Sequence, residues 1–263
     1  MSKTLTPQSL DLTAIARRAI AVLDLTNLNE DCDAAAIEAL CLKAMTPHGP
    51  AAAVCIFPRF VTQAKRLLKG TGIKVATVAN FPAGENDPGG AVATTVKAFA
   101  DGADEVDVVL PYGTFLEGKT AAALKLLRDV RAEVPRGKKL KVIIETGELK
   151  SEMAILAATQ LAIEAGAHFV KTSTGKTPES ATPRSAFLML ETIRASKKKV
   201  GFKAAGGIRT TVDAGIYLAI ADGLMGRDWA TPATFRFGAS GVLDDLMRVL
   251  SGEAAPTPAK DRY

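Results

Sequence analysis

The sequence predicts an α/β fold, a closed (β/α)8 TIM barrel with a short N-terminal helix and a flexible C-terminal tail. Eight short apolar runs recur along the 263 residues, and a helical pattern follows each of them. Strict alternation favours parallel strands, and α/β barrels of about 250 residues commonly form one domain. We therefore expect one domain over residues 1–263. An open doubly wound sheet is the alternative, which is disfavoured because no Gly-x-Gly-x-x-Gly follows the first predicted strand.

The elements are predicted in order from their periodicity. After an amphipathic opening at residues 10–18, the predicted strands cover residues 21–25, 52–57, 74–78, 105–110, 140–146, 169–174, 200–204 and 235–239. Apolar residues at three- and four-residue spacing predict helices at residues 35–45, 60–68, 91–100, 120–134, 153–165, 185–193, 212–220 and 243–250. Gly70, Gly102 and Gly166 are candidate left-handed caps. Residues 251–263 lack apolar periodicity, so we expect a mobile tail.

The composition excludes several classes of protein. It is 48% hydrophobic and 23% charged, which is typical of a globular chain. The first ten residues lack an apolar signal core and no run approaches the roughly 20 residues of a membrane span, so we expect a cytoplasmic protein with no membrane partner. The net charge of +5 raises the question of nucleic acid. The basic residues are dispersed, however, and we interpret the clusters at 136–141 and 197–199 as solvated loops and helix ends, with no nucleic-acid partner.

The cysteines and histidines do not form a recognisable metal or disulfide pattern. Cys32, Cys41 and Cys55 fit neither a paired framework nor a redox motif, so we expect reduced thiols. His48 and His168 lie far in sequence from any cysteine or histidine partner. We therefore expect no metal site.

Charged residues recur inside the predicted strands. Lys171 lies in the middle of an apolar run, and a lysine is almost never fully buried unless it is paired or functional. Helices cover the outside of a barrel, so polar positions in phase with the strand alternation should point inward. The predicted lumen side chains are Asp24, Thr26, Glu105, Asp107, Glu145, Lys171 and Lys203.

Two lysines on adjacent strands favour chemistry over a purely structural ion-pair network, which is the alternative. Two ammonium groups roughly 6 Å apart at an effective dielectric constant near 20 repel by about 3 kcal/mol, equivalent to about two in pKa. Partial desolvation lowers the pKa of a lysine further. The pairing of Lys171 with Lys203 therefore predicts that one of the two is a neutral, nucleophilic amine, and it suggests Schiff-base chemistry on a carbonyl.

The loops after the last three predicted strands are suited to an anion. Glycines allow backbone N–H groups to approach a phosphate, and a helix begins after the third of these loops. Phosphates commonly bind at this end of a barrel. The candidate phosphate-binding residues are Thr174, Gly175, Lys176, Gly206, Gly207, Arg209, Gly238 and Ser240.

Several longer motifs occur along nearly the whole chain. They are Val-Leu-Asp-Leu-Thr (22–26), Cys-Ile-Phe-Pro-Arg-Phe (55–60), Ala-Asp-Glu-Val-Asp-Val-Val (103–109), Val-Ile-Ile-Glu-Thr-Gly-Glu-Leu-Lys (142–150), Val-Lys-Thr-Ser-Thr-Gly-Lys (170–176), Gly-Phe-Lys-Ala-Ala-Gly-Gly-Ile-Arg-Thr (201–210) and Arg-Phe-Gly-Ala-Ser (236–240). These motifs resemble the deoxyribose-phosphate aldolase family, and its enterobacterial type in particular. A terminal tyrosine, Tyr263, adds to the likeness.

The resemblance implies a class I aldolase of deoxyribose catabolism. Such an enzyme cleaves 2-deoxy-D-ribose 5-phosphate reversibly to acetaldehyde and D-glyceraldehyde 3-phosphate without a cofactor. On this reading Lys171 forms the Schiff base and Lys203 lowers its pKa. Asp107 relays protons with the support of Asp24, and Tyr263 helps to protonate the enamine. Thr26 and the glycine-rich loops bind the substrate and its phosphate.

Two departures from the family pattern and several alternatives stay open. Ala204 stands where proline is usual and should affect loop rigidity, and Gly241 replaces a second serine, which should weaken the hold on phosphate.

The alternatives are another Schiff-base sugar-phosphate aldolase, a transaldolase or a non-catalytic sugar-phosphate binder. Cys55 is either an inert buried thiol or one that adds to unsaturated aldehydes. A homodimer is the assembly considered.

Overall fold

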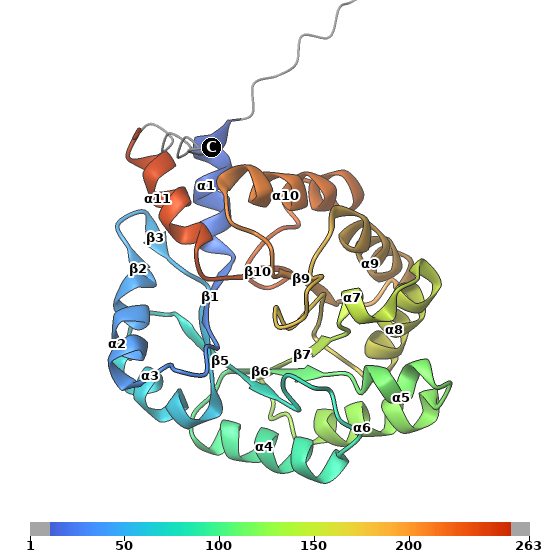
Figure 1. Ribbon diagram of the computed structural model, residues 1–263. Helices are drawn as coiled ribbons and strands as arrows, with labels where there is room; N and C mark the ends of the chain where they lie inside the picture. The colour runs from blue at the N-terminus through green and yellow to red at the C-terminus, as the bar shows by residue number, and fades with distance from the viewer. Residues whose placement is uncertain (1–10, 254–263) are drawn as a thin grey trace, which may run out of the picture.

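The computed structural model describes residues 11–253, and its centre is a closed barrel of eight parallel strands (Figure 1). The barrel closes because β1 pairs with both β10 and β4. The predicted (β/α)8 barrel is thereby confirmed and the open sheet is excluded. In barrel order the strands are β1 (Leu23–Asn27), β10 (Phe235–Ala239), β9 (Gly201–Ala205), β8 (Phe169–Lys171), β7 (Lys139–Ile143), β6 (Glu105–Val109), β5 (Lys74–Ala79) and β4 (Ala53–Ile56).

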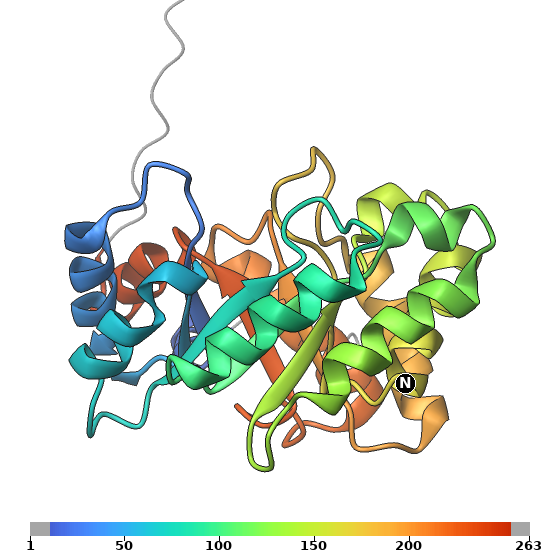
Figure 2. The same ribbon diagram turned by 90° about the horizontal axis from the view of Figure 1, so that it is seen from below.

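Helices surround the strands as an outer ring, which Figure 2 shows from the side. The helix that precedes β1, α1, lies in this ring beside α10 and α11 (Figure 1). The ring consists of α1 (Leu12–Ala21), α2 (Ala34–Lys43), α3 (Val61–Leu67), α4 (Pro88–Ala100), α6 (Thr120–Ala132), α8 (Glu152–Glu164), α9 (Pro183–Ser196), α10 (Thr211–Met225) and α11 (Val242–Leu250).

Several short elements were not predicted, because segments of two to five residues carry no periodicity. They are the hairpin of β2 (Met45–Thr46) and β3 (Gly49–Pro50), the 3₁₀ helix η1 (Pro58–Phe60), and the helices α5 (Tyr112–Leu116) and α7 (Thr146–Leu149). The predicted tail lies largely outside the described residues, since residues 254–263, including Tyr263, are not described. Within residues 11–253, no helix combines the length and apolar character that crossing a bilayer requires.

Local sequence explains where the helices begin and end. The side chain of Thr182 accepts a hydrogen bond from the N–H of Ser185 to form a capping box at the start of α9, and Thr210 does the same with Asp213 at α10. Gly102 and Gly166 follow α4 and α8 with φ of 104° and 85°, which confirms their prediction as caps. These caps fix the residues at which α9 and α10 begin and at which α4 and α8 end.

The two faces of the strands differ in polarity as the alternation predicts. Val106 and Val108 of β6 pack in the core between strands and helices, whereas Glu105 and Asp107 point into the lumen. Two predicted strands are too long, because β7 ends at Ile143 and β8 at Lys171. The barrel therefore positions its lumen charges with helices shielding the outside.

Candidate active site

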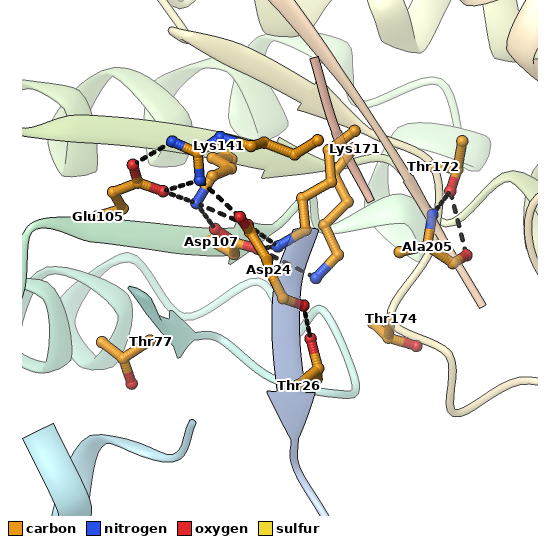
Figure 3. Close-up of polar contacts among 12 residues, drawn as sticks. Asp24, Thr26, Thr77, Glu105, Asp107, Lys141, Lys171, Thr172, Thr174 and Ala205 are labelled. Carbon is orange, nitrogen blue, oxygen red and sulfur yellow. Dashed lines mark hydrogen bonds and ion pairs between the residues drawn. The ribbon is translucent and has the colours of Figure 1, made fainter. Parts of the chain in front are cut away.

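Six strands send charged side chains into the lumen, and Figure 3 shows several of them converging. Each of these side chains belongs to a residue that is at most 4% exposed. We call this group the lumen cluster; its members are Asp24 of β1, Glu105 and Asp107 of β6, Lys141 of β7, Lys171 of β8, Lys203 of β9 and Arg236 of β10.

Asp107 lies at the centre of the cluster and accepts hydrogen bonds from three lysines. Lys141 Nζ lies 2.7 Å from its Oδ1, whereas Lys203 Nζ and Lys171 Nζ lie 2.9 and 3.1 Å from its Oδ2. Lys203 also donates to Asp24 Oδ2 at 2.6 Å. Lys171 and Lys203 are register partners in adjacent strands, so their ammonium groups share one carboxylate oxygen.

The cluster holds more potential cations than carboxylates. Four basic side chains, Lys141, Lys171, Lys203 and Arg236, face three carboxylates. Of the four, Lys171 alone has a single carboxylate within 4.0 Å among the described residues. Loss of the Lys171 proton would balance the charge, so Lys171 is the amine that the cluster stabilises least as a cation.

The direction of each pKa shift agrees with this geometry. Burial and then the charge of Lys203 lower the pKa of Lys171. Burial alone would also lower the pKa of Lys203, but Asp107 and Asp24 outweigh it and raise that pKa. Asp107 is buried too, yet Lys141 and Lys203 hold its pKa well below the usual range. Lys171 is therefore the amine of the cluster whose neutral form is favoured most, and it lies beside a carboxylate and an ammonium group that the carboxylates stabilise.

Two members of the lumen cluster, Lys141 and Arg236, are not among the predicted lumen residues. Lys141 was assigned to a solvated basic run, which is wrong, because it is fully buried and bonded to Asp107 and Glu105. Arg236 was noticed only as part of a motif. Both lie in phase with the inward residues of their strands, so alternation could have found them. Burial, which was treated as an addition to the repulsion by Lys203, is the larger cause of the lowered pKa of Lys171.

A cavity of ≈ 450 Å³ opens at the carboxyl ends of β1, β8, β9 and β10. All nine residues predicted to bind substrate or phosphate line it: Thr26, Thr174, Gly175, Lys176, Gly206, Gly207, Arg209, Gly238 and Ser240. Leu28, Asn29, Ile208, Ala239 and Gly241 complete the lining. We call it the glycine-loop cavity. Within residues 11–253, neither Lys176 nor Arg209 forms an ion pair with a carboxylate.

Two glycines of this cavity are required by close packing. A Cβ at Gly238 would lie 2.9 Å from Lys203 Cε, so glycine here leaves room for the lysine to reach the lumen cluster. A Cβ at Gly206 would lie 2.5 Å from the side chain of Ser180, and Gly206 has a φ of +84°. The glycine-loop cavity and the lumen cluster therefore meet at Gly238.

Glu145 was expected in the lumen as part of a strand, but it lies in the turn after β7. It has a left-handed φ of 55° and occupies the N-cap position of the short helix α7, without a capping hydrogen bond from its side chain. Its buried carboxylate accepts hydrogen bonds from the N–H and the hydroxyl of Thr174, and burial raises its pKa despite them. Thr174 Oγ1 in turn accepts from the N–H of Lys176 at 3.0 Å. Glu145 thus holds the loop after β8 at the edge of the glycine-loop cavity.

The two departures from the family pattern lie in different environments. Ala204 is fully buried inside β9, so the expectation that it affects a loop is wrong. Gly241 lies before α11 on the lining of the glycine-loop cavity, with open space around the position of a Cβ. The consequence of Gly241 for phosphate binding stays a prediction.

Cys55 of β4 is fully buried, and burial raises the pKa of its thiol. Lys203, Asp107 and Lys171 are the charged groups that affect this pKa most. Its packing against Ala53, Ala76 and Val78 is that of a small apolar side chain. Among the described residues, no group of three or more His, Cys, Asp and Glu side chains is arranged to hold a metal ion.

A larger cavity of ≈ 580 Å³ lies at the opposite, amino-terminal end of the strands. Its lining includes Ala52, Lys74 and Phe169 together with Glu105 and Arg236, and it is mostly apolar. Active sites of (β/α)8 enzymes lie at the carboxyl ends of the strands. We therefore assign the chemistry to the smaller glycine-loop cavity, which borders Lys203 through Gly238.

The fold and this site define a (β/α)8 barrel with a buried lysine of lowered pKa beside a cavity lined by glycine-rich loops. Comparison with known proteins agrees. Residues 18–230 match the model of the DeoC/LacD family of aldolases, so this chain belongs to that family. It is 50% identical over 245 residues to a deoxyribose-phosphate aldolase of Agrobacterium fabrum, covering 93% of this chain and 94% of the relative.

Solved structures share the architecture. An aldolase named QR15 superposes with a TM-score of 0.74 at 29% identity, covering 93% of this chain and 100% of that chain. The deoxyribose phosphate aldolase of Aeropyrum pernix, described as tetrameric, has a TM-score of 0.73 at 22% identity, covering 93% and 99% of the two chains. At that identity the second likeness supports the fold alone.

Proposed function

We propose that this chain cleaves 2-deoxy-D-ribose 5-phosphate reversibly to acetaldehyde and D-glyceraldehyde 3-phosphate, with Lys171 as the Schiff-base nucleophile. The observation that carries the proposal is that Lys171, alone among the four lumen cations, has only one carboxylate partner and a lowered pKa. The family match and the 50% identical relative support the choice of substrate.

The phosphate of the substrate would lie in the glycine-loop cavity. Backbone N–H groups of the loops at 174–176, 206–207 and 238–240, and the start of α11, provide donors and partial positive charge. Lys176 and Arg209 line the same cavity and supply charge-assisted hydrogen bonds to the dianion. The phosphate held there directs the carbonyl carbon of the open-chain sugar toward Lys171.

The chemistry then follows from the lumen cluster. Neutral Lys171 Nζ attacks the C1 aldehyde to form a carbinolamine, and loss of water gives the protonated Schiff base. Removal of the proton from the C3 hydroxyl breaks the C2–C3 bond, whose electron pair moves into the iminium and forms an enamine. Glyceraldehyde 3-phosphate leaves with C3 as its new aldehyde. Protonation of the enamine at C2 and hydrolysis release acetaldehyde and restore the amine.

Proton movements are assigned to the neighbours of Lys171. Asp107 is a carboxylate 3.1 Å from Lys171 Nζ, so it is placed to take and return protons, directly or through water. Lys203 stays protonated, and Asp24 binds it at 2.6 Å from the opposite side. Tyr263, proposed as the donor to the enamine, lies outside the described residues.

Reduction with borohydride in the presence of acetaldehyde tests the proposal. We expect one ethyl group to be added, and peptide mapping should place it on Lys171. Lys171→Ala should abolish the adduct, whereas Lys176→Ala, which removes a lysine of the glycine-loop cavity, should keep it. An adduct on another lysine would refute the assignment. Absence of any adduct would favour a sugar-phosphate binder. An adduct that forms with a ketose phosphate supplied in place of acetaldehyde, and not with acetaldehyde, would favour a transaldolase or another aldolase.

The homodimer and the cytoplasmic location expected from the sequence stay predictions. Light scattering of the purified chain would measure the mass of the assembly directly.

A further inference from the structure

Arg236 is the member of the lumen cluster that lies farthest from the proposed chemistry. It extends from β10 toward the amino-terminal end of the barrel, where it lines the larger cavity. Its Nη1 donates to Asp24 Oδ1 at 2.5 Å and its Nη2 to Glu105 Oε1 at 2.8 Å, while its Nε donates to the carbonyl of Pro232 at 2.6 Å. A side chain held in this way is directed away from a substrate at the carboxyl ends of the strands.

Both carboxylates that Arg236 binds are shared with a lysine of the cluster. Asp24 offers one oxygen to Arg236 and the other to Lys203. Glu105 binds Arg236 through both oxygens, at 2.8 Å from Oε1 and 3.2 Å from Oε2, and its Oε2 also binds Lys141 at 2.6 Å. Arg236 therefore takes up carboxylate charge that would otherwise compensate the lysines.

We propose that Arg236 is a positioning residue for the amine chemistry: it supplies the fourth cation of the lumen cluster and so leaves Lys171 without a carboxylate of its own. The proposal rests on the proposed role of Lys171 as the nucleophile. Lys203 repels Lys171 directly, whereas Arg236 acts through Asp24 and Glu105. The balance of four cations against three carboxylates, and not one neighbouring lysine alone, then favours the neutral amine.

The titratable groups that act on Lys171 come from six strands of the barrel, which are all except β5 and the strand of Lys171 itself, β8. Lys203 of β9, Asp107 of β6 and Cys55 of β4 act on it most strongly. Lys141 of β7, Asp24 of β1, Arg236 of β10 and Glu105 of β6 complete the lumen cluster, and Glu145 acts from the turn after β7. Changing Arg236 or Glu105 leaves the direct contacts of Lys171 in place, which makes these two residues suitable for a test.

The charge count predicts that substitutions at the two positions shift the pH midpoint of Lys171 trapping in opposite directions. Arg236→Met keeps most of the side-chain volume but leaves three cations for three carboxylates, so the midpoint of the pH dependence of Lys171 trapping should rise. Glu105→Gln leaves four cations for two carboxylates, so the midpoint should fall. Each shift should be about one pH unit or more, since unit charges about 8 Å apart interact appreciably at an effective dielectric constant near 20. The double variant has three cations for two carboxylates and should return close to the parent.

Borohydride trapping with acetaldehyde over a pH series, quantified by intact mass, measures these midpoints, and thermal unfolding of each variant reports the fold. A rise for Arg236→Met, a fall for Glu105→Gln and a return in the double variant support the proposal. Midpoints equal to the parent, or shifts of the same sign in both single variants, overturn it.

If Arg236→Met does not fold, the comparison of Glu105→Gln with the double variant still tests whether Arg236 lowers the midpoint of trapping at Lys171. The double variant must then trap with a higher midpoint than Glu105→Gln, and an equal or lower midpoint overturns the proposal. Failure of the proposed function looks different, because in that case the parent itself is not trapped at Lys171.

Discussion

Replacing Lys203 by leucine should raise the pH at which Lys171 becomes reactive. Both ammonium groups lie within 3.1 Å of Asp107 Oδ2, which keeps the two nitrogens within about 6 Å of each other. At an effective dielectric constant near 20, two such charges repel by about 3 kcal/mol, equivalent to about two in pKa. Lys203→Leu removes this repulsion and leaves the burial of Lys171 largely unchanged.

The midpoint for borohydride trapping with acetaldehyde should therefore rise by about two pH units. At pH 7 the neutral fraction of Lys171, and with it the rate of trapping, should fall by about 100-fold. Trapping itself should survive, because the nucleophile is still present. Single-turnover trapping, quantified by intact mass in steps of about half a pH unit from about pH 6 to about pH 10, would measure the midpoint.

Lys203→Arg is the matched control, because it keeps the positive charge beside Asp24 and Asp107. Its midpoint should stay near that of the parent even if the altered geometry slows the reaction. A Lys203→Leu protein that folds and traps with the parent midpoint would show that Lys203 does not set the pKa of Lys171. The lowered pKa would then have to come from burial and from the other cations of the lumen cluster.

Four further predictions concern the glycine-loop cavity, the terminal residue and stability. Ser240→Asp places a carboxylate against the phosphate, so KM for the phosphorylated sugar should rise about tenfold or more, with little change for unphosphorylated deoxyribose. Ser240→Asn is the neutral control, and equal losses on both sugars would argue against this loop. Gly241→Ser adds a hydroxyl where nothing lies within 4 Å of the Cβ position, and KM for the phosphorylated sugar should fall a few-fold, as steady-state kinetics would show. Deletion of Tyr263 should lower kcat by roughly 10²-fold without abolishing borohydride trapping; a normal kcat with normal deuterium exchange at the acetaldehyde methyl group would remove its role. Burial lowers the pKa of His168 to about 4, and its Nδ1 accepts a hydrogen bond from the N–H of Leu140 at 3.0 Å. The stability that neutral His168 contributes should therefore be complete above about pH 6.5, the pKa of an unfolded histidine, and should be lost as the pH falls toward about 4. His168→Gln should flatten this part of a plot of melting temperature against pH, and an unchanged slope would contradict the assignment.

The sequence by itself determined the barrel and the sites facing its mouth. Period-two and period-3.6 patterns depend only on local neighbours, so eight strands and their helices could be located to within a few residues. The same alternation placed Asp24, Asp107, Lys171 and Lys203 inside the lumen. Glycine-rich loops after the last three strands were recognisable because positive φ and close backbone approach demand that residue type.

Only the tertiary structure decided which charges compensate one another. Lys138 and Lys141 belong to the same basic run, yet Lys138 pairs with Asp104 at the surface while Lys141 lies fully buried against Asp107 and Glu105. Asp24 and Arg236 are 212 residues apart in sequence, and closure of the barrel brings them within 2.5 Å. Pairing at such separations depends on strand register and barrel closure, which no local pattern records. That is the physical reason why the sequence indicated Lys171 as a candidate reactive amine but could not show that Arg236 and Lys141 bind the carboxylates that would otherwise compensate its charge.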